Sequence, residues 1–336
     1  MRPTDFATQL TRFLGEYLPA QKNLSPNTIR AYRDVFTLFL RYCRDQRGLS
    51  PEHVELNTID VPFVLDFLNH LETERKCSAR TRNHRLSALH AFFRYLQTEE
   101  PARIMHCQQI LAIPFKRFER SSVHYLSTEE LEVVLAQPDL TTAVGRRDAV
   151  LLSVLYDTGA RVQELVDLDV RDVRLHSPAQ IHLTGKGGKI RAVPLLSGTV
   201  DLLAEYVREH NLHRPERLDS PLFCNRRGER LSRSGVRYIL EKYTEQARRT
   251  GAELHMTVTP HTLRHSKAMH LLHAGNSAPV IQAILGHADV GIVNIYARAN
   301  MEMMRGALEK AASIQPGRTM PSWQENQGLM DWLRSL

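Results

Sequence analysis

Cysteine is scarce in this sequence of 336 residues, which contains only Cys43, Cys77, Cys107 and Cys224. The four are scattered, with no Cys-x-x-Cys pair and no other spacing typical of metal ligands. This pattern argues against a disulfide-stabilised scaffold and against a structural zinc site. We expect buried or free thiols in a reducing compartment.

Long apolar runs are absent as well. No run approaches the ~18 residues that a membrane-spanning helix needs, and residues 1–18 carry charges throughout, without the apolar segment of a signal peptide. We therefore expect a cytoplasmic protein with no membrane partner. The histidines also lack a nearby cluster of carboxylates, which a metal-dependent nuclease or transposase would need.

Positive charge is present in excess. The net charge is +7 and the pI is about 9.3, which favours an acidic partner, most commonly nucleic acid. Many basic proteins bind nothing anionic, so charge alone leaves the partner open. Hydrophobic residues make up 42% and charged residues 24% of the chain, as in folded globular proteins. The length allows about two domains.

Residues 1–112 predict a helical bundle, because apolar residues recur at spacings of three and four and no strand pattern occurs. One helix is expected to begin at Ser25-Pro26 and another near Ser78, with a third around residues 64–71 between them. Four or five short helices would form this domain. The two outer helices carry arginines near their starts, which can contact DNA phosphates or simply face solvent. We expect DNA contacts from Arg30, Arg33, Arg80, Arg82 and Arg85.

Residues 113–125 are expected to be a linker, since they contain proline and a basic run without periodicity. The second domain, 126–336, then begins at a capping-box pattern. Three segments in it predict short strands: 172–176, 180–184 and 189–194. The last two flank a glycine-rich turn, which predicts a β-hairpin with Lys186 at its tip. The sequence therefore predicts a mainly α protein, a helical bundle followed by an α+β domain with a small antiparallel sheet.

Two helices of the second domain begin with charged residues that could take part in catalysis. Arg161 follows a helix-breaking glycine, and Glu164 lies three residues on, where its carboxylate can fix the arginine for a phosphate. A surface ion pair worth ~0.3 kcal/mol is the alternative. His261 and Arg264 share the first turn of a helix that Thr259 caps, where an anion is favoured. His265 is expected to pack or cap.

The remaining candidates are individually ambiguous. Lys186 is protonated at neutral pH, with an ordinary pKa of ~10.4, so it can donate a proton or merely solubilise the turn. Gly286 ends an apolar helix and is followed by His287, which alone would be considered structural. Tyr296 lies among apolar residues, where tyrosine is usually part of a core.

Order and spacing make these residues more specific. Five motifs follow one another: Thr158-Gly159-Ala160-Arg161, Gly185-Lys186-Gly187, His261-Thr262-Leu263-Arg264, Leu285-Gly286-His287 and, nine residues later, Tyr296. This series resembles the tyrosine recombinase (phage integrase) family, which includes Xer-type chromosome recombinases and transposon recombinases. The resemblance spans roughly residues 25–297. Ala160, where bulkier residues are usual, and the long extension after Tyr296 are departures.

The resemblance implies a SAM-like, DNA-clamping N-terminal domain and a covalent mechanism in the second domain. Tyr296 would attack a DNA phosphodiester, form a 3′-phosphotyrosine and release a 5′-hydroxyl. Arg161 and Arg264 would neutralise the non-bridging oxygens, with Glu164 orienting Arg161. Because one phosphate ester replaces another, neither metal nor other cofactor is expected.

The other family positions imply proton transfer and assembly. Lys186 would protonate the 5′ oxygen, His261 would handle the tyrosine proton, and His287 would bind the phosphate. The implied partner is double-stranded DNA with inverted-repeat sites, bound by a protein that is monomeric in solution and tetrameric in the synapse. Accessory proteins or a sister recombinase can be required. Apolar residues in the tail, 299–336, favour docking on a neighbouring protomer over packing in cis.

The sequence leaves the biological role open. Integration, excision or transposition of a mobile element is the main interpretation, and Xer-type resolution of chromosome or plasmid dimers is the alternative. A type IB topoisomerase would use the same residues, but the helical N-terminal domain argues against it. A non-catalytic DNA-binding regulator would have lost a catalytic residue, and none is lost here.

Overall fold

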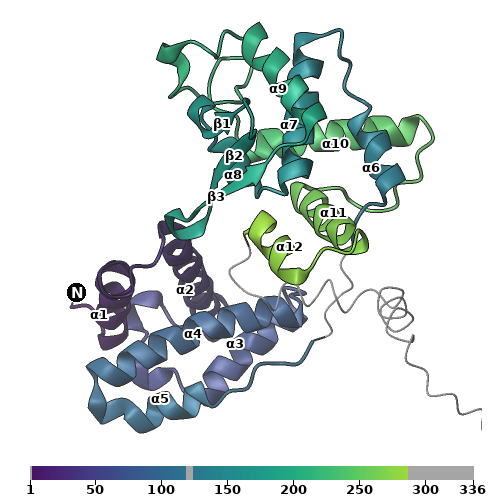
Figure 1. Cartoon of the computed structure of the whole chain (residues 1–336). Coiled ribbons are helices and arrows are strands. Elements are labelled where there is room, and N and C mark those ends of the chain that lie inside the picture. The colour runs from purple at the N-terminus through teal and green to yellow at the C-terminus, as the bar shows by residue number, and fades with distance from the viewer. Residues whose placement is uncertain (1, 119–123, 287–336) are drawn as a thin grey trace, which may run out of the picture. The chain divides into compact units, whose positions relative to one another are not determined.

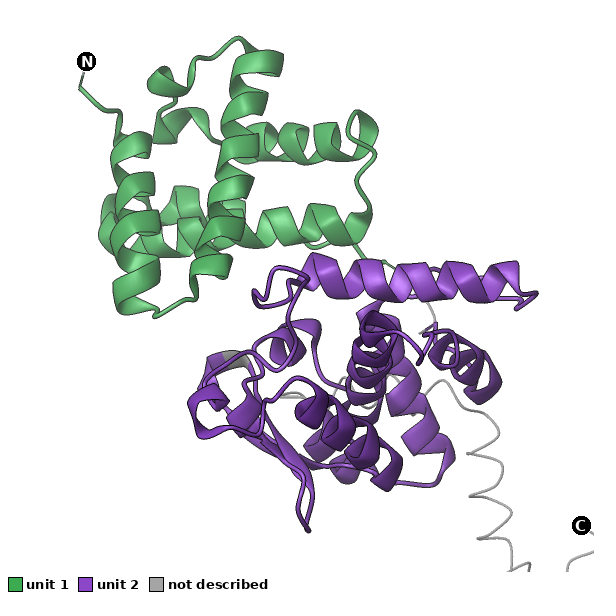
Figure 2. Cartoon of the chain, turned by 90° about the horizontal axis from the view of Figure 1, so that it is seen from above, with its two compact units in different colours: residues 1–121 green, residues 122–336 purple. Residues whose placement is uncertain are grey.

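The computed structural model of the chain describes residues 2–118 and 124–286. The chain divides into two compact units, unit 1 (residues 1–121) and unit 2 (residues 122–336) (Figure 2). Each has its own hydrophobic core, with Ile113 buried in the first and Leu126 in the second. The domain limits expected from the sequence, 1–112 and 126–336 with a linker between them, stay a prediction.

The described part of unit 1 is built from helices joined by short turns (Figure 1). Its α-helices are α1 (Asp5–Arg12), α2 (Pro26–Arg47), α3 (Val61–Thr73), α4 (Ala79–Glu99) and α5 (Ile104–Leu111). A π-helical segment, η1 (Phe13–Gln21), continues α1, and the 3-10 turns are η2 (Pro51–His53), η3 (Leu56–Thr58) and η4 (Pro101–Arg103). The predicted helical bundle is confirmed.

Local capping explains where α2 and α4 begin. The Ser25 hydroxyl accepts a hydrogen bond from the Thr28 N–H at 3.3 Å, and Pro26 is the first helical residue. Ser78 caps α4 in the same way through the N–H of Thr81. Both predicted starts are confirmed. The expectation of short helices was wrong here: α2 has 22 and α4 has 21 residues, because no glycine or internal proline interrupts them.

Aromatic rings fill the core of unit 1. Phe13, Phe36 of α2 and Phe92 of α4 are buried, and the ring centroids of Phe36 and Phe13 lie 5.3 Å and 5.4 Å from that of Phe92, edge to face. Burial of each ring stabilises the fold by about 1.5–3 kcal/mol. The cluster holds α2 against α4, and this decides which arginines of the two helices face solvent.

Unit 2 combines helices with one small sheet (Figure 1). Its α-helices are α6 (Thr128–Leu135), α7 (Ala143–Thr158), α8 (Val162–Val166), α9 (Ser197–Glu209), α10 (Arg233–Arg249), α11 (Pro260–His273) and α12 (Ala278–Leu285). Its strands are β1 (Val173–Arg174), β2 (Gln180–Thr184) and β3 (Ile190–Pro194), and its 3-10 turns are η5 (Val170–Asp172), η6 (Lys186–Gly188) and η7 (Pro215–Arg217). Across the described ranges of both units, no helix is long and apolar enough to cross a membrane.

The sheet has the order β1-β2-β3, with both pairs antiparallel. Strands β2 and β3 form the predicted hairpin, closed by a hydrogen bond from Gly185 N–H to the Lys189 carbonyl at 2.8 Å. β1 is shorter than the five residues expected, because residues 175–179 are needed for the turn into β2. Ile181 and Val193, paired across the hairpin, are buried in the core of unit 2.

Candidate active site

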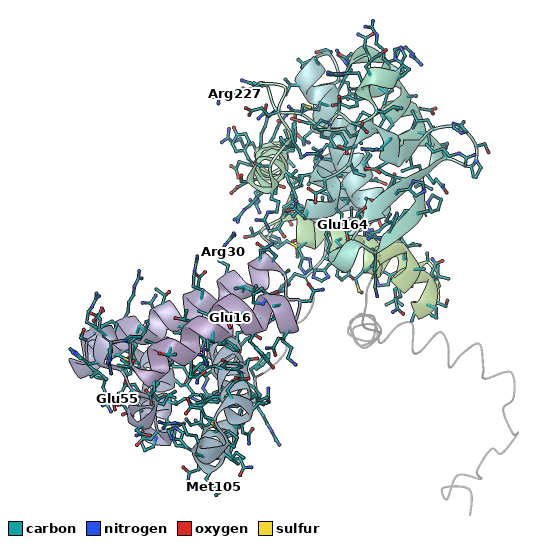
Figure 3. All side chains as sticks on the ribbon, turned by 90° about the vertical axis from the view of Figure 1, so that its left-hand side faces the viewer. Glu16, Arg30, Glu55, Met105, Glu164 and Arg227 are labelled. Carbon is teal, nitrogen blue, oxygen red and sulfur yellow. The ribbon has the colours of Figure 1, made fainter. Side chains whose placement is uncertain are left out.

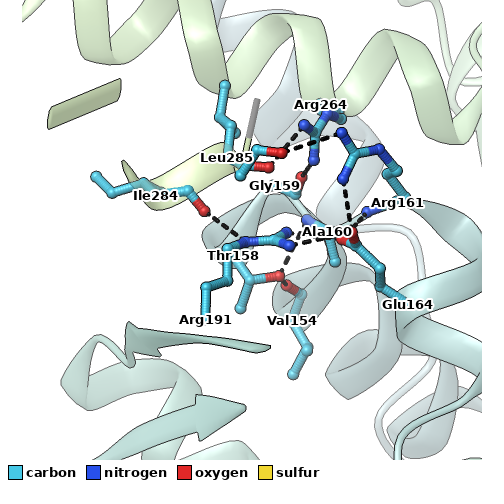
Figure 4. A network of polar contacts seen from close by, with 11 residues as sticks. Val154, Thr158, Gly159, Ala160, Arg161, Glu164, Arg191, Arg264, Ile284 and Leu285 are labelled. Carbon is cyan, nitrogen blue, oxygen red and sulfur yellow. Dashed lines mark hydrogen bonds and ion pairs between the residues drawn. The ribbon is translucent and has the colours of Figure 1, made fainter. Parts of the chain in front are cut away.

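Segments that are distant in the sequence meet at the end of α7 (Figure 4). Gly159 ends this helix in the left-handed conformation, with φ of +56°. A Cβ atom at Gly159 would lie 2.3 Å from Leu285 Cδ2 of α12. Glycine is therefore required twice, for the backbone turn and for the close approach of α12.

Arg161 and Glu164 form a pair at the start of α8. Arg161 Nη1 donates to Glu164 Oε1 at 2.7 Å, and the Arg161 backbone N–H donates to Oε2 at 2.8 Å. Arg161 Nη2 donates to the Gly286 carbonyl at 3.1 Å. The side chain of Glu164 is 3% exposed while that of Arg161 is 40% exposed, so this is not a surface ion pair. A buried carboxylate holds a guanidinium that still reaches solvent.

Arg191 is a member of this network that the sequence analysis missed. From β3, its Nη1 and Nη2 donate to the two oxygens of Glu164 at 3.0 and 2.7 Å, and its Nε donates to the Ile284 carbonyl at 2.9 Å. A signal was present in the strand alternation, since Arg191 and Val193 share one face of β3 and Val193 is buried. An arginine on the inward face of a strand needs a partner.

The electrostatics of Glu164 follow from these contacts. Burial by itself would raise the pKa of Glu164, but hydrogen bonds from Arg191 and Arg161 outweigh it and lower the pKa below its ordinary value. Glu164 is therefore a carboxylate at neutral pH. Its negative charge partly compensates the two guanidiniums beside it.

Arg264 is the fifth residue of α11 and is 2% exposed. The predicted helix start is confirmed, with the Thr259 hydroxyl accepting from the Thr262 N–H and Pro260 at the first position. Arg264 Nη1 donates to the Gly159 carbonyl at 2.6 Å, and its Nη2 donates to the Leu285 carbonyl at 2.7 Å. These two carbonyls end α7 and α12, where helices leave acceptors unpaired.

Two imidazoles lie edge to face near Arg264. The rings of His261, which is exposed, and His265 lie 4.0 Å apart between centroids. Partial loss of hydration, then the positive charges of Arg264 and Arg161, lower the pKa of His261. Burial, then His261 and Arg264, lower the pKa of His265 to about 4. Both imidazoles are thus neutral near pH 7, and His265 packs as expected.

The structure covers the other predicted site residues unequally. Lys186 begins the η6 turn between β2 and β3, as predicted, and a Cβ atom at the preceding Gly185 would lie 3.2 Å from Glu164 Oε1. The hairpin turn therefore starts against the network. Gly286 ends α12 with φ of +65°, as predicted. His287, Tyr296 and the tail 299–336 lie outside the described residues.

The predicted DNA-binding arginines of unit 1 differ in exposure. Arg30 (Figure 3), Arg33 and Arg80 are exposed, although Arg33 pairs with the neighbouring Asp34, and Arg85 is half-buried. The expectation for Arg82 is corrected: it is 4% exposed and donates Nη1 to the Pro114 carbonyl at 3.1 Å. It precedes the buried Leu86 and Leu89 by four and seven residues, which places it on the inward face of α4.

Comparison with known proteins gives the family. The chain matches the Phage integrase family over residues 124–303, more than half of its length, and the Phage integrase N-terminal SAM-like domain over residues 10–100. The chain belongs to the phage integrase family. As a tyrosine recombinase of this family, it is an enzyme of site-specific recombination that cleaves and rejoins DNA strands.

Relatives of this tyrosine recombinase are similar over most of their length. The integrase/recombinase y4rC of Sinorhizobium fredii is 38% identical, over 98% of either chain. The tyrosine recombinase XerC of Pelotomaculum thermopropionicum is 32% identical, over 88% of this chain and 95% of its own. A solved post-cleavage complex of the XerH recombinase with a palindromic difH substrate is similar with a TM-score of 0.66 and 26% identity, covering 87% of this chain and 81% of that one.

Proposed function

We propose that this recombinase cuts double-stranded DNA by attack of the Tyr296 hydroxyl on a phosphodiester. The new bond is a 3′-phosphotyrosine, and the bond that breaks releases a 5′-hydroxyl. Attack by the 5′-hydroxyl of a second duplex then forms a new phosphodiester and frees Tyr296. One phosphate ester replaces another at each step, so the cycle is balanced without metal or nucleotide.

One observation carries this proposal: Arg161 and Arg264 converge on successive carbonyls, those of Gly286 and Leu285, at the end of α12. Two guanidiniums are thus held at one helix end, next in sequence to His287. Planar guanidiniums suit a phosphate, whose non-bridging oxygens gain charge in the transition state. Groups fixed before the reaction stabilise that charge without further reorganisation.

The remaining roles concern protons and orientation. Lys186 protonates the leaving 5′ oxygen, and His261 accepts the proton of Tyr296. The lowered pKa of His261 supports this role, because only a neutral imidazole can accept a proton. His287 donates a hydrogen bond to the phosphate, and Glu164 orients Arg161.

The proposed substrate is a DNA site with inverted repeats, as the palindromic difH site is for XerH. Arg30, Arg33, Arg80 and Arg85 of unit 1 bind backbone phosphates. The protein is a monomer in solution and a tetramer in the synapse, where its tail docks on a neighbouring protomer. Accessory proteins or a sister recombinase take part where the site requires them.

Integration, excision or transposition of a mobile element is the proposed role. The similarity to the integrase/recombinase y4rC along nearly the whole chain supports it. Resolution of chromosome or plasmid dimers is the second candidate, because XerC and XerD relatives match at 32–34% identity. Recombination sites flanking the gene within one mobile element would favour the first role.

A nicked suicide duplex tests the chemistry. After cleavage near the nick, the short 5′-hydroxyl fragment diffuses away, so a protein–DNA adduct accumulates and is seen on a denaturing gel. Tyr296→Phe lacks only the nucleophilic oxygen and should bind DNA like the wild type but form no adduct. An adduct with the same 3′ end in this variant would refute Tyr296 as the nucleophile.

A further inference from the structure

Glu164 accepts more hydrogen bonds than orienting Arg161 requires. Its Oε1 accepts from Nη1 of both Arg161 and Arg191, and its Oε2 accepts from the Arg161 backbone N–H and from Arg191 Nη2. Four donors match the roughly four acceptor positions of a carboxylate. Arg191 contributes the side chain that spans both oxygens, while Arg161 uses one side-chain N–H here and keeps Nη2 for Gly286.

Arg191 also contacts the end of α12. Its Nε donates to the Ile284 carbonyl, one of the terminal carbonyls without a partner inside the helix. A cation at the C-terminal end of a helix is favourable, because the helix dipole is negative there. A Cβ atom at Gly286 would lie 2.8 Å from Arg191 Nη1 and 3.0 Å from its Cδ. The guanidinium therefore packs directly against the residue that precedes His287.

We propose that Arg191 is a positioning residue of the recombination site. It joins the β2–β3 hairpin of Lys186, the Arg161–Glu164 pair and the end of α12 into one unit. Its side chain is 13% exposed, so it acts on the phosphate through Arg161 and not by direct contact. This inference rests on the proposed function, because it assumes that Arg161 binds the scissile phosphate.

The consequence of removing Arg191 follows from the acceptors of Glu164. A buried carboxylate that has lost one of its two cations is under-compensated, which favours new hydrogen bonds from nearby donors. Arg161 can then turn to bond both oxygens of Glu164, which withdraws Nη2 from Gly286 and the guanidinium from the phosphate. A displacement of about 1 Å in a catalytic group can reduce the rate about a hundredfold.

Arg147 provides a matched control in the same unit. Its side chain is 14% exposed beside Asp148 at 2%, against 13% and 3% for Arg191 and Glu164. Two of its N–H groups donate to Asp148 Oδ1, and a third donates to the Cys224 carbonyl at 3.1 Å. Arg147→Met therefore removes a comparable buried ion pair and carbonyl bond without touching the site.

The experiment compares full-length Arg191→Met and Arg147→Met for thermal unfolding, single-site DNA affinity and single-turnover adduct formation on the nicked duplex. Methionine keeps part of the aliphatic stem and removes the charge. Both variants should unfold at lower temperature and bind DNA nearly as the wild type does. Arg191→Met should form adduct about tenfold to a hundredfold more slowly than Arg147→Met, measured where both are folded.

Two further readouts separate positioning from loss of stability. If Arg191 acts through Arg161, adding Arg191→Met to Arg161→Ala should slow adduct formation no further. A methylphosphonate at the scissile position carries one negative charge fewer than the phosphodiester, in the ground state and in the transition state. Arg161 then has less charge to neutralise, so this substrate should shrink the defect of Arg191→Met. The proposal would be overturned if the two methionine variants formed adduct at equal rates. It would also be overturned if the rate losses of Arg191→Met and Arg161→Ala multiplied in the double variant.

Arg191→Lys keeps the test valid if the methionine variant fails to fold. Lysine retains a cation beside Glu164 but lacks the planar fork with which Arg191 bonds both carboxylate oxygens while its Nε reaches the Ile284 carbonyl. It should therefore fold, bind DNA and still form adduct slowly, and a wild-type rate would overturn the positioning role. If the wild type itself forms no adduct, the proposed function fails first and the inference fails with it.

Discussion

Unit 1 and unit 2 each bury an arginine, and the surroundings of the two differ. Arg82 is 4% exposed and donates to Asn83 and to the Pro114 carbonyl, while its Nε has no hydrogen-bond partner within the described residues. Arg264 is 2% exposed and donates to carbonyls at the ends of two helices. Equal burial therefore serves different purposes: Arg82 ties the chain after α5 to α4, while Arg264 gathers segments that carry the recombinase motifs.

The same contrast holds for the two units as wholes. Aromatic rings fill the core of unit 1, and the exposed Arg30, Arg33 and Arg80 lie on the surfaces of its helices. Unit 2 buries a charged network around Glu164, which costs desolvation that an apolar core would not. Proteins accept such a cost where chemistry needs fixed charges. Substitutions in the network around Glu164 should therefore affect the rate of cleavage, and those in unit 1 the affinity or the stability.

The largest effect should come from the hairpin of unit 2. Lys186→Ala removes the proposed general acid, so cleavage should slow by about 10²–10⁴-fold. A duplex with a 5′-bridging phosphorothiolate should restore cleavage, because the thiolate leaves without a proton. Single-turnover rates on both substrates check this.

Arg161→Ala is the control for that rescue, since it loses charge stabilisation and not an acid. Equal recovery of both variants on the sulfur substrate would refute Lys186 as the acid, and Lys189 would be examined next.

Substitution of the two buried arginines, Arg264 and Arg82, should have clearly different effects. Arg264→Lys keeps a charge but loses the paired donors, so cleavage should fall by about 10²–10³-fold. Arg82→Lys should lower the unfolding temperature while the folded fraction cleaves nearly normally. Thermal unfolding and adduct formation measured on the same samples check this. If Arg82→Lys slowed cleavage as much as Arg264→Lys, the proposed difference between a stabilising arginine in unit 1 and a catalytic arginine in unit 2 would be wrong.

A smaller effect is expected from the surface of unit 1. Arg80→Ala should weaken DNA binding and reduce the slope of log affinity against log salt by about 1, since one phosphate contact is lost. Cleavage at saturating protein should not change. Arg94→Ala is the control, because Arg94 is also exposed on α4 but lies well away from its start. Equal weakening by both variants would indicate a general charge effect and not a contact at the helix start.

The smallest effect concerns pH. A histidine with an ordinary pKa of about 6.5 is half protonated at pH 6.5. The lowered pKa of His261 keeps it mostly neutral there, so lowering the pH from 7.5 to 6.5 should reduce cleavage less than twofold, with the loss growing only at lower pH. Single-turnover rates of the wild type and His261→Gln across this range check it. A steep fall above pH 6.5, absent in His261→Gln, would contradict the assignment.

Local features of the chain were predictable because their causes lie within a few residues. The starts of α2, α4 and α11 follow from the caps Ser25, Ser78 and Thr259, and the end of α12 follows from Gly286. The hairpin around Lys186 follows from glycines between two β-rich segments. The pairing of Arg161 with Glu164 needed only their spacing on one helix turn.

Burial and long-range partners required the tertiary structure. Glu164 meets Arg191 across 27 residues, and Arg264 meets the Gly159 carbonyl across 105. The burial of Arg82 depends on the segment near Pro114 that covers it. The motifs, the helix ends and the resemblance to a family follow from the order of the amino acids alone, since spacing and capping act locally. Only packing decided which charges became buried and paired, because that depends on which segments the fold brings together.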